Sequence, residues 1–230
     1  MEPDNTTPHN ASEYDQVIRG IIPLYETIQS ESVDLVNSVR PDVKYWLDTG
    51  CGSGYLIEVA LPLFPQTHFI LTDPSECMLR EAKKRFENKP SERVKIHTAM
   101  GSEKLMPSGL EVKPQVITAI LCHHYLTASG RRRAVQSCFE ILEEGGLLVA
   151  FENIDFGLSR ANEIALDRWG NHQMKQGSSV SAVEAHRKRF KARYFPITID
   201  EHLDLLKNTG FQMSKMFWLS YMQAGFFAIK

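Results

Sequence analysis

Residues 45–54, Tyr-Trp-Leu-Asp-Thr-Gly-Cys-Gly-Ser-Gly, decide the fold that this chain is expected to adopt. The apolar residues 45–47 predict a short buried strand that closes on Asp48. Glycines follow at positions 50, 52 and 54, and residues 55–61 read as the start of a helix. A glycine-rich turn between a strand and a helix lets the backbone approach a nucleotide-like ligand closely.

The glycine spacing and Asp48 distinguish this turn from a dinucleotide site. A dinucleotide turn receives a pyrophosphate at the helix N-terminus and favours a third glycine three residues after the second. Here the pattern is Gly-x-Gly-x-Gly, and the carboxylate of Asp48 would repel a pyrophosphate but attract a cation. A nicotinamide oxidoreductase is therefore disfavoured.

A second acidic residue closes the next predicted strand, residues 68–72. Asp73 follows Gly54 by nineteen residues, where a carboxylate can accept hydrogen bonds from both ribose hydroxyls. A ligand with a ribose, a positive charge and no phosphate fits both acidic positions. S-adenosylmethionine is such a ligand.

Together, residues 47–54 and 71–78 resemble the cofactor motifs of class I S-adenosylmethionine-dependent methyltransferases. The likeness covers residues 43–152 well and extends more loosely to both ends. It implies an α/β fold with a Rossmann-like, mostly parallel sheet of seven strands, helices on both faces and the last strand antiparallel. We expect a flexible tail at 1–12, an N-terminal helical lid at 13–40, and a methyltransferase domain at 41–230 with a helical insertion at about 155–195.

Hydrophobic patterns along the rest of the chain agree with this fold. Thr198-Ile-Asp-Glu201 is a capping box that begins the last helix. A helix is expected over 182–194, and another opens at Arg131-Arg-Arg133, whose arginines are expected to face solvent rather than nucleic acid. The remaining predicted strands are 94–98, 116–122, 147–151, 213–221 and 225–229.

The bulk composition excludes some partners. The net charge of the 230 residues is −2, so no global field recruits nucleic acid or an anionic membrane. No apolar run approaches the ~20 residues of a membrane span, and the N-terminus lacks the features of a signal peptide. The four cysteines include no Cys-x-x-Cys pair, which favours reduced thiols in a cytoplasmic protein, either a monomer or a homodimer.

The resemblance also implies which residues contact S-adenosyl-L-methionine. Where the family often has an acid after the third strand to hold the adenine, this chain has Ala99 and Met100, so their backbone groups are expected to serve. Tyr14 and Tyr25 are lid residues or, equally, pack against the sheet. The expected cofactor contacts are Asp48, Gly50, Cys51, Gly52, Gly54, Asp73, Pro74, Met78, Ala99, Met100, Cys122, His123, Tyr14 and Tyr25.

Residues 122–126, Cys-His-His-Tyr-Leu, follow the fourth strand at the edge of the sheet where ligands bind in open α/β folds. We expect Cys122 and His123 beside the sulfonium, with His124 and Tyr125 nearer the acceptor as the catalytic residues. Neighbouring histidines project differently, so at most one faces the substrate, and a hydrogen-bonded structural role stays open for each. No third ligand has metal-site spacing, so no metal is expected.

Methyl transfer from a sulfonium is an in-line displacement that needs alignment more than elaborate chemistry. The Asn/Asp-Pro-Pro-Tyr/Phe motif of many base-amino methyltransferases is missing after the fourth strand, and no extra basic domain is present. The leading prediction is therefore an S-adenosylmethionine-dependent methyltransferase acting on a small molecule. Its expected substrate residues lie around the insertion: Trp169, Arg187, Arg189 and Tyr194.

Two alternatives stay open. Ile22-Pro-x-Tyr25 and residues 155–230 also resemble carboxy-S-adenosylmethionine synthase, a tRNA-modification enzyme. That family binds the added carboxylate with an arginine of the late insertion, to which Arg187 or Arg189 corresponds, but its glycine turn departs from the standard pattern kept here. The second alternative is a non-catalytic S-adenosylmethionine-binding module, because an in-line displacement leaves no obligatory catalytic residue to look for.

Overall fold

A computed structural model describes residues 9–87 and 91–230 of the chain. Its strands form one seven-stranded sheet in the order β3-β2-β1-β4-β5-β7-β6. Pairing is parallel from β3 to β5, and β7 runs antiparallel to both of its neighbours. This confirms the predicted Rossmann-like sheet with its last strand antiparallel. The strands are β1 (Tyr45–Thr49), β2 (His68–Thr72), β3 (Val94–Ile96), β4 (Val116–Ile120), β5 (Leu147–Asn153), β6 (Met213–Ser220) and β7 (Gln223–Ile229).

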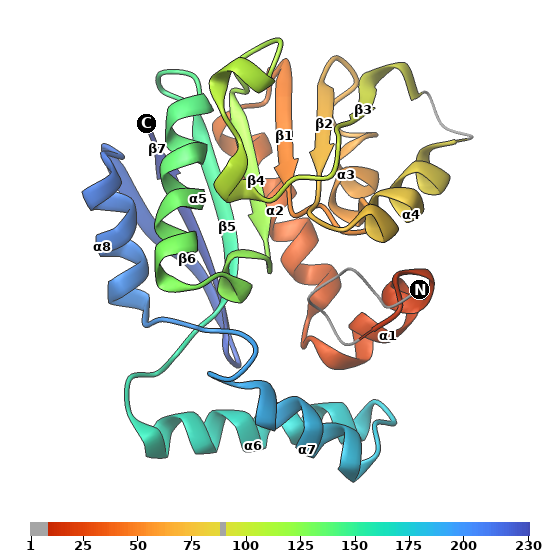
Figure 1. Cartoon of the computed structure of the whole chain (residues 1–230), viewed down its shortest axis with the longest axis vertical. Coiled ribbons are helices and arrows are strands. Elements are labelled where there is room, and N and C mark those ends of the chain that lie inside the picture. Colours follow the sequence, from red (N-terminus) through yellow and green to blue (C-terminus); the bar gives the residue numbers. More distant parts are fainter. Residues whose placement is uncertain (1–8, 88–90) are drawn as a thin grey trace.

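Helices cover both faces of the sheet (Figure 1). On one face, α2 (Tyr25–Val39), α3 (Tyr55–Ala60) and α4 (Glu76–Phe86) share a buried cluster with side chains of β1 and β2. On the other face, α5 (Ala128–Ile141) and α8 (Ile199–Thr209) enclose a second cluster around side chains of β4 and β5. The central strands are apolar on both sides because helices bury both of their faces.

Three further helices gather at one end of the sheet: α1 (Tyr14–Ile21), α6 (Ser159–Lys175) and α7 (Val180–Arg189). Figure 1 shows α6 and α7 lying across the lower end of the sheet. A third apolar cluster, which includes Ile18, Phe151 and Trp169, joins α1 and α6 to the end of β5. Helix α1 and the helices at 159–189 therefore lie at the carboxyl ends of the parallel strands.

Local sequence signals explain several helix ends. The Ser75 hydroxyl accepts from the Met78 N–H at 3.1 Å and starts α4. The capping box predicted at Thr198 and Glu201 is confirmed. Gly210 ends α8 with φ of 119°, a conformation that favours glycine. The remaining helical segments are short 3-10 turns: η1 (Ala11–Glu13), η2 (Ser91–Arg93), η3 (Ser102–Lys104), η4 (Pro107–Gly109) and η5 (His123–Tyr125).

Several boundaries of these elements differ from the predicted ones. The helix expected over 182–194 ends at Arg189, where the chain turns and Lys191 adopts φ of 59°. Strands β3 and β4 stop two residues early, at Ile96 and Ile120. Strand β5 continues two residues farther than predicted, to Asn153, and β7 begins two residues earlier, at Gln223. These errors lie where the chain enters or leaves regular structure, and hydrophobic periodicity alone cannot locate such an end.

Residues 131–133 were all predicted to face solvent, and this prediction was wrong for one of the three arginines. Helix α5 begins at Ala128, so Arg131 lies within it, 2% exposed, and its guanidinium donates to the Phe195 carbonyl. Arg132 and Arg133 are exposed as expected. Arg131 thus fastens the segment after α7 to the body of the fold.

The described ranges contain no helix that is both long and apolar enough to cross a membrane. The tail predicted at 1–12 falls mostly on residues 1–8, outside those ranges. The lid and insertion boundaries remain predictions.

Candidate active site

The glycine turn after β1 adopts backbone conformations that glycine alone enters easily. Gly50, Gly52 and Gly54 have φ of 67°, 54° and 81°. A Cβ at Gly50 would lie 2.5 Å from the Cβ of Cys122, and one at Gly54 would lie 2.8 Å from the Phe86 ring. A Cβ at Gly52 would meet nothing within 4 Å. Gly54, expected to contact the cofactor, therefore serves helix packing, whereas Gly52 faces open space.

Asp73 holds this turn in place from the end of β2. The Gly52 N–H donates to Oδ2 of Asp73 at 2.9 Å, and the Ser75 N–H donates to Oδ1 at 2.8 Å. Asp73 is 7% exposed and lines a pocket together with Pro74 and Met78. A negative charge therefore sits in the pocket wall where β2 ends.

Asp48 contributes a second carboxyl group to the wall of this region. The Thr118 hydroxyl donates to it at 2.6 Å, and in turn accepts from the Trp46 indole N–H at 3.0 Å. Burial raises the pKa of Asp48 to about 7; the Thr118 hydrogen bond opposes this and the charge of Asp73 adds to it. A bound cation would favour the ionised form.

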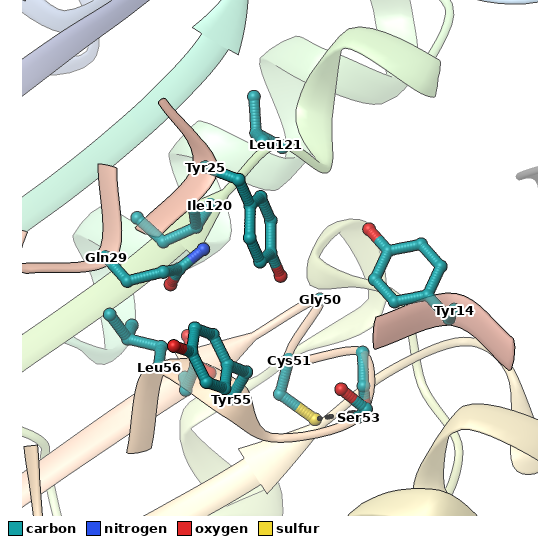
Figure 2. Close-up of a pocket in the computed structure, with 12 residues that line it drawn as sticks. Tyr14, Tyr25, Gln29, Gly50, Cys51, Ser53, Tyr55, Leu56, Ile120 and Leu121 are labelled. Atoms are coloured by element: carbon teal, nitrogen blue, oxygen red, sulfur yellow. Dashed lines mark hydrogen bonds between the residues drawn. The ribbon is translucent and has the colours of Figure 1, made fainter. Parts of the chain in front are cut away.

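Tyrosines enclose the space beside the turn (Figure 2). Tyr25 stacks on Tyr55 with ring centroids 5.9 Å apart and planes at 17°. Tyr14 comes from α1, and Figure 2 shows its hydroxyl pointing into the same space as that of Tyr25. Burial raises the pKa of Tyr14 and of Tyr25, so both phenols stay neutral. The structure thus places both expected lid tyrosines in the pocket wall.

Two adjoining pockets make up this region, and we call them together the loop pocket. They share Tyr14, Gly50, Gly52, Ile120 and Leu121. The other lining residues are Tyr25, Gln29, Asp48, Cys51, Ser53, Tyr55, Leu56, Asp73, Pro74, Met78, Cys122, Tyr125 and Leu126.

A smaller cavity, which we call the α7 chamber, lies on the other side of Tyr125. Tyr125, Arg189 and Tyr194 line it, together with His9, Ile18, Ile21, Ile22, Asn153 and His186. Tyr194 is 3% exposed, and its hydroxyl has no hydrogen-bond partner among the described residues. Burial raises the pKa of Tyr125, while the charge and hydrogen bond of Arg189 lower it in part. The chamber therefore combines one cation with an unsatisfied hydroxyl.

His124 lies beneath the chamber rather than in it. Its Nδ1 is 2.8 Å from Glu152, and its Nε2 is 3.1 Å from Nδ2 of Asn153. Oδ1 of Asn153 accepts from Gln223, so Nδ2 of Asn153 donates to His124 and the ring proton sits on Nδ1. Both ring nitrogens are engaged, His124 is 1% exposed, and the ring packs 4.5 Å from that of Tyr125. This placement does not support the prediction that His124 faces the acceptor, whereas Tyr125 lines both pockets.

His123 and the residues after β3 also lie away from the loop pocket. Nε2 of His123 is 2.9 Å from the Ser102 hydroxyl, and burial lowers the pKa of His123. Met100 donates its N–H to the Asp73 carbonyl at 3.0 Å and packs against the α5 and α8 cluster. Neither Met100 nor Ala99 lines a described pocket. Cofactor contacts expected at these three positions are not supported by their placement.

The four expected substrate residues divide into two pairs. Arg189 and Tyr194 line the α7 chamber. Arg187 instead pairs with Asp167 of α6, and Trp169, 1% exposed, donates to the Ile21 carbonyl at 2.6 Å. Of the two arginines, Arg189 lines a cavity, whereas Arg187 is engaged by Asp167.

Several residues of this region were not among the predicted site residues. Tyr55 directly follows the third glycine, and Gln29 lies one helical turn after Tyr25, so helical spacing could have found both. Glu152 is a polar residue at the end of an apolar strand, a signal that points to the same edge of the sheet. Residues 9–87 and 91–230 contain no group of three or more His, Cys, Asp or Glu side chains that could hold a metal ion.

The chain is similar to known proteins in sequence and in fold. Residues 47–148 match the family model described as a methyltransferase domain. The chain is 22% identical over 206 residues to carboxy-S-adenosyl-L-methionine synthase of Nautilia profundicola, covering 88% of this chain and 84% of that protein. For the Hydrogenovibrio crunogenus synthase the identity is 24% over 220 residues, covering 94% and 85%.

Among solved structures, the plantazolicin methyltransferase BamL, determined in complex with a triazolic desmethylPZN analog and SAH, has a similar fold. The TM-score is 0.68 at 14% identity, covering 95% of this chain and 88% of that chain.

Proposed function

We propose that the loop pocket of this class I S-adenosylmethionine-dependent methyltransferase domain binds the cofactor and presents its methyl group to a small acceptor in the α7 chamber. The observation that carries this proposal is that Tyr125 lines both cavities. A cofactor in one and an acceptor in the other would meet at this side chain. Such a meeting point supplies the alignment on which in-line displacement depends.

The residues of the loop pocket fit S-adenosyl-L-methionine. The carboxylate of Asp73 suits two ribose hydroxyls, and Gly52 leaves room for a close approach. Asp48 suits the positive charge of the methionine part, because a cation offsets the cost of ionising a buried carboxyl group. Bound there, the cofactor supplies an electrophilic methyl group.

The α7 chamber suits a small acceptor that carries an anionic group. Arg189 can pair with a carboxylate, and the Tyr194 hydroxyl can donate to it. Tyr125 is a neutral phenol, so its role is to position the acceptor rather than to remove a proton. An acceptor that is already deprotonated needs no base.

A second candidate function is carboxy-S-adenosylmethionine synthesis. The similarity to synthases over most of the chain favours it, and so does the place of Arg189 next to the loop pocket. In this case Arg189 would hold the carboxylate added to the cofactor. The standard glycine turn favours methyl transfer, which we retain as the leading proposal.

We also propose a cellular location and an oligomeric state for the protein. A net charge of −2 and four free cysteines, at 51, 77, 122 and 138, support a cytoplasmic protein without direct nucleic-acid or membrane contact, as a monomer or homodimer.

The test is calorimetric titration of S-adenosylmethionine into wild-type protein and Asp73→Ala. Hydrogen bonds to a charged group contribute about 1.5–3 kcal/mol, so affinity should fall roughly ten- to hundredfold. Asp34→Ala, an exposed position on α2, is the matched control and should bind like wild type. Equal affinity of wild type and Asp73→Ala, with unchanged melting curves, would contradict the proposed cofactor site.

A further inference from the structure

Arg85 of α4 contacts three separate elements at once. Its Nε donates to the Ser53 carbonyl in the glycine turn at 2.7 Å. Its two terminal nitrogens pair with Glu58 on α3 and with Asp15 on α1. The Arg85 side chain is 15% exposed and does not line the loop pocket. One guanidinium therefore joins α1, the glycine turn and α3 from outside the pocket.

Ser53 completes this arrangement from inside the pocket wall. Its hydroxyl donates to Oδ1 of Asp15 at 2.6 Å and lies 3.3 Å from Nη2 of Arg85. Asp15 therefore accepts from the glycine turn with one oxygen and pairs with Arg85 through the other. The start of α1 is fixed to the turn that lines the cofactor site.

Tyr14 is the residue directly before Asp15, in the first turn of α1. It lines both parts of the loop pocket, and Figure 2 shows its ring opposite Tyr25 across the pocket. The position of the Tyr14 ring consequently depends on where Asp15 is held. Farther along α1, Arg19 lies over the Tyr55 ring at 4.8 Å and provides a second contact.

We propose that Arg85 is a positioning residue that, through Asp15, holds Tyr14 over the loop pocket and thereby slows the release of S-adenosylmethionine. The inference rests on the proposed function, because it takes the loop pocket as the cofactor site. Arginine suits this task since its planar fork can serve three acceptors in fixed directions, whereas the single ammonium of lysine cannot.

The experiment measures dissociation of radiolabelled S-adenosylmethionine from the full chain by rapid filtration during an unlabelled chase. Asp15→Asn and Arg85→Lys should each raise the dissociation rate by about tenfold, which corresponds to losing one charged hydrogen bond. The association rate should change much less, because the open pocket is the same in every variant. The effects of the two substitutions should not add in the double variant, because both break the same Arg85–Asp15 pair.

Arg80→Lys is the matched control. Arg80 lies on the same helix, is exposed, and contacts the Cys77 sulfur rather than α1. It should release the cofactor at the wild-type rate.

Wild-type dissociation rates in both variants, or fully additive effects in the double variant, would overturn the inference. A merely structural role of Arg85 would lower the Tm without changing the dissociation rate well below the Tm. If Arg85→Lys does not fold, Asp15→Asn alone decides. Wild-type protein that does not retain S-adenosylmethionine would contradict the proposed function itself, whereas retention with unaltered release in the variants would contradict only the role of Arg85.

Discussion

Replacing Asp48 with asparagine should remove a pH dependence from the stability of the protein without ligand. Asp48 is 2% exposed, and burial, aided by the charge of Asp73 and opposed by the Thr118 hydrogen bond, raises its pKa from 3.8 to about 7. In the unfolded chain the carboxyl group titrates at its ordinary value. Between the two values the folded protein holds one more proton than the unfolded chain, so the free energy of unfolding falls as pH rises.

The size of this effect follows from the two pKa values of Asp48. Each pH unit between them changes the free energy of unfolding by about 1.4 kcal/mol. The interval from 3.8 to about 7 therefore corresponds to an upper limit of about 4 kcal/mol. This stability is fully present below the unfolded value and is lost as pH rises through about 7.

Urea denaturation of wild-type protein and Asp48→Asn at several values between about pH 4 and pH 8 measures this effect. Asparagine cannot ionise, yet its side-chain oxygen can still accept from the Thr118 hydroxyl. The stability difference between the two proteins should therefore shift in favour of the variant as pH rises. A difference that stays constant over the whole range would refute the reasoning, because it would mean that Asp48 titrates alike in the folded and unfolded protein.

Two other substitutions test the packing around the site. Glu152→Ala should lower the free energy of unfolding, measured by urea denaturation, by about 3–5 kcal/mol. The reason is that the backbone N–H groups of His123 and His124 and Nδ1 of His124 lose a buried charged acceptor. A decrease below about 1 kcal/mol, as for an exposed ion pair, would contradict this. Gly54→Ala should lower the free energy of unfolding by about 1–3 kcal/mol more than Gly177→Ala does. Both glycines have positive φ, but only a Cβ at Gly54 would meet the Phe86 ring. Equal decreases in the two variants would show that backbone strain alone matters.

The strands and the glycine turn were predictable because their signals are local. Apolar runs such as 116–120 bury both faces of a central strand. Asp48 is the penultimate residue of β1, and Asp73 directly follows β2. Parallel strands bring such ends to one edge of the sheet, so spacing in the sequence becomes proximity in space. The same reasoning placed Tyr125 at this edge.

The sequence was least informative where tertiary contacts decide the role of a residue. The local sequence does not show which of His124 and Tyr125 faces a pocket. The ring nitrogens of His124 are engaged by Glu152 and Asn153, which lie on β5, far away in the sequence. The local sequence predicts that Arg131 faces solvent, but its guanidinium donates to the carbonyl of Phe195, a residue 64 positions later in the chain. The sequence gives no reason to prefer Arg187 or Arg189 as a substrate residue. In the fold, α6 lies where its Asp167 pairs with Arg187.

Mass spectrometry of the ligand released from purified protein tests the central claim most directly. The account predicts S-adenosylmethionine or its demethylated product, with the same mass from wild type, Arg187→Ala and Arg189→Ala. A ligand heavier than S-adenosylmethionine by one carboxylate, lost selectively in Arg189→Ala, would contradict methyl transfer and establish the synthase instead.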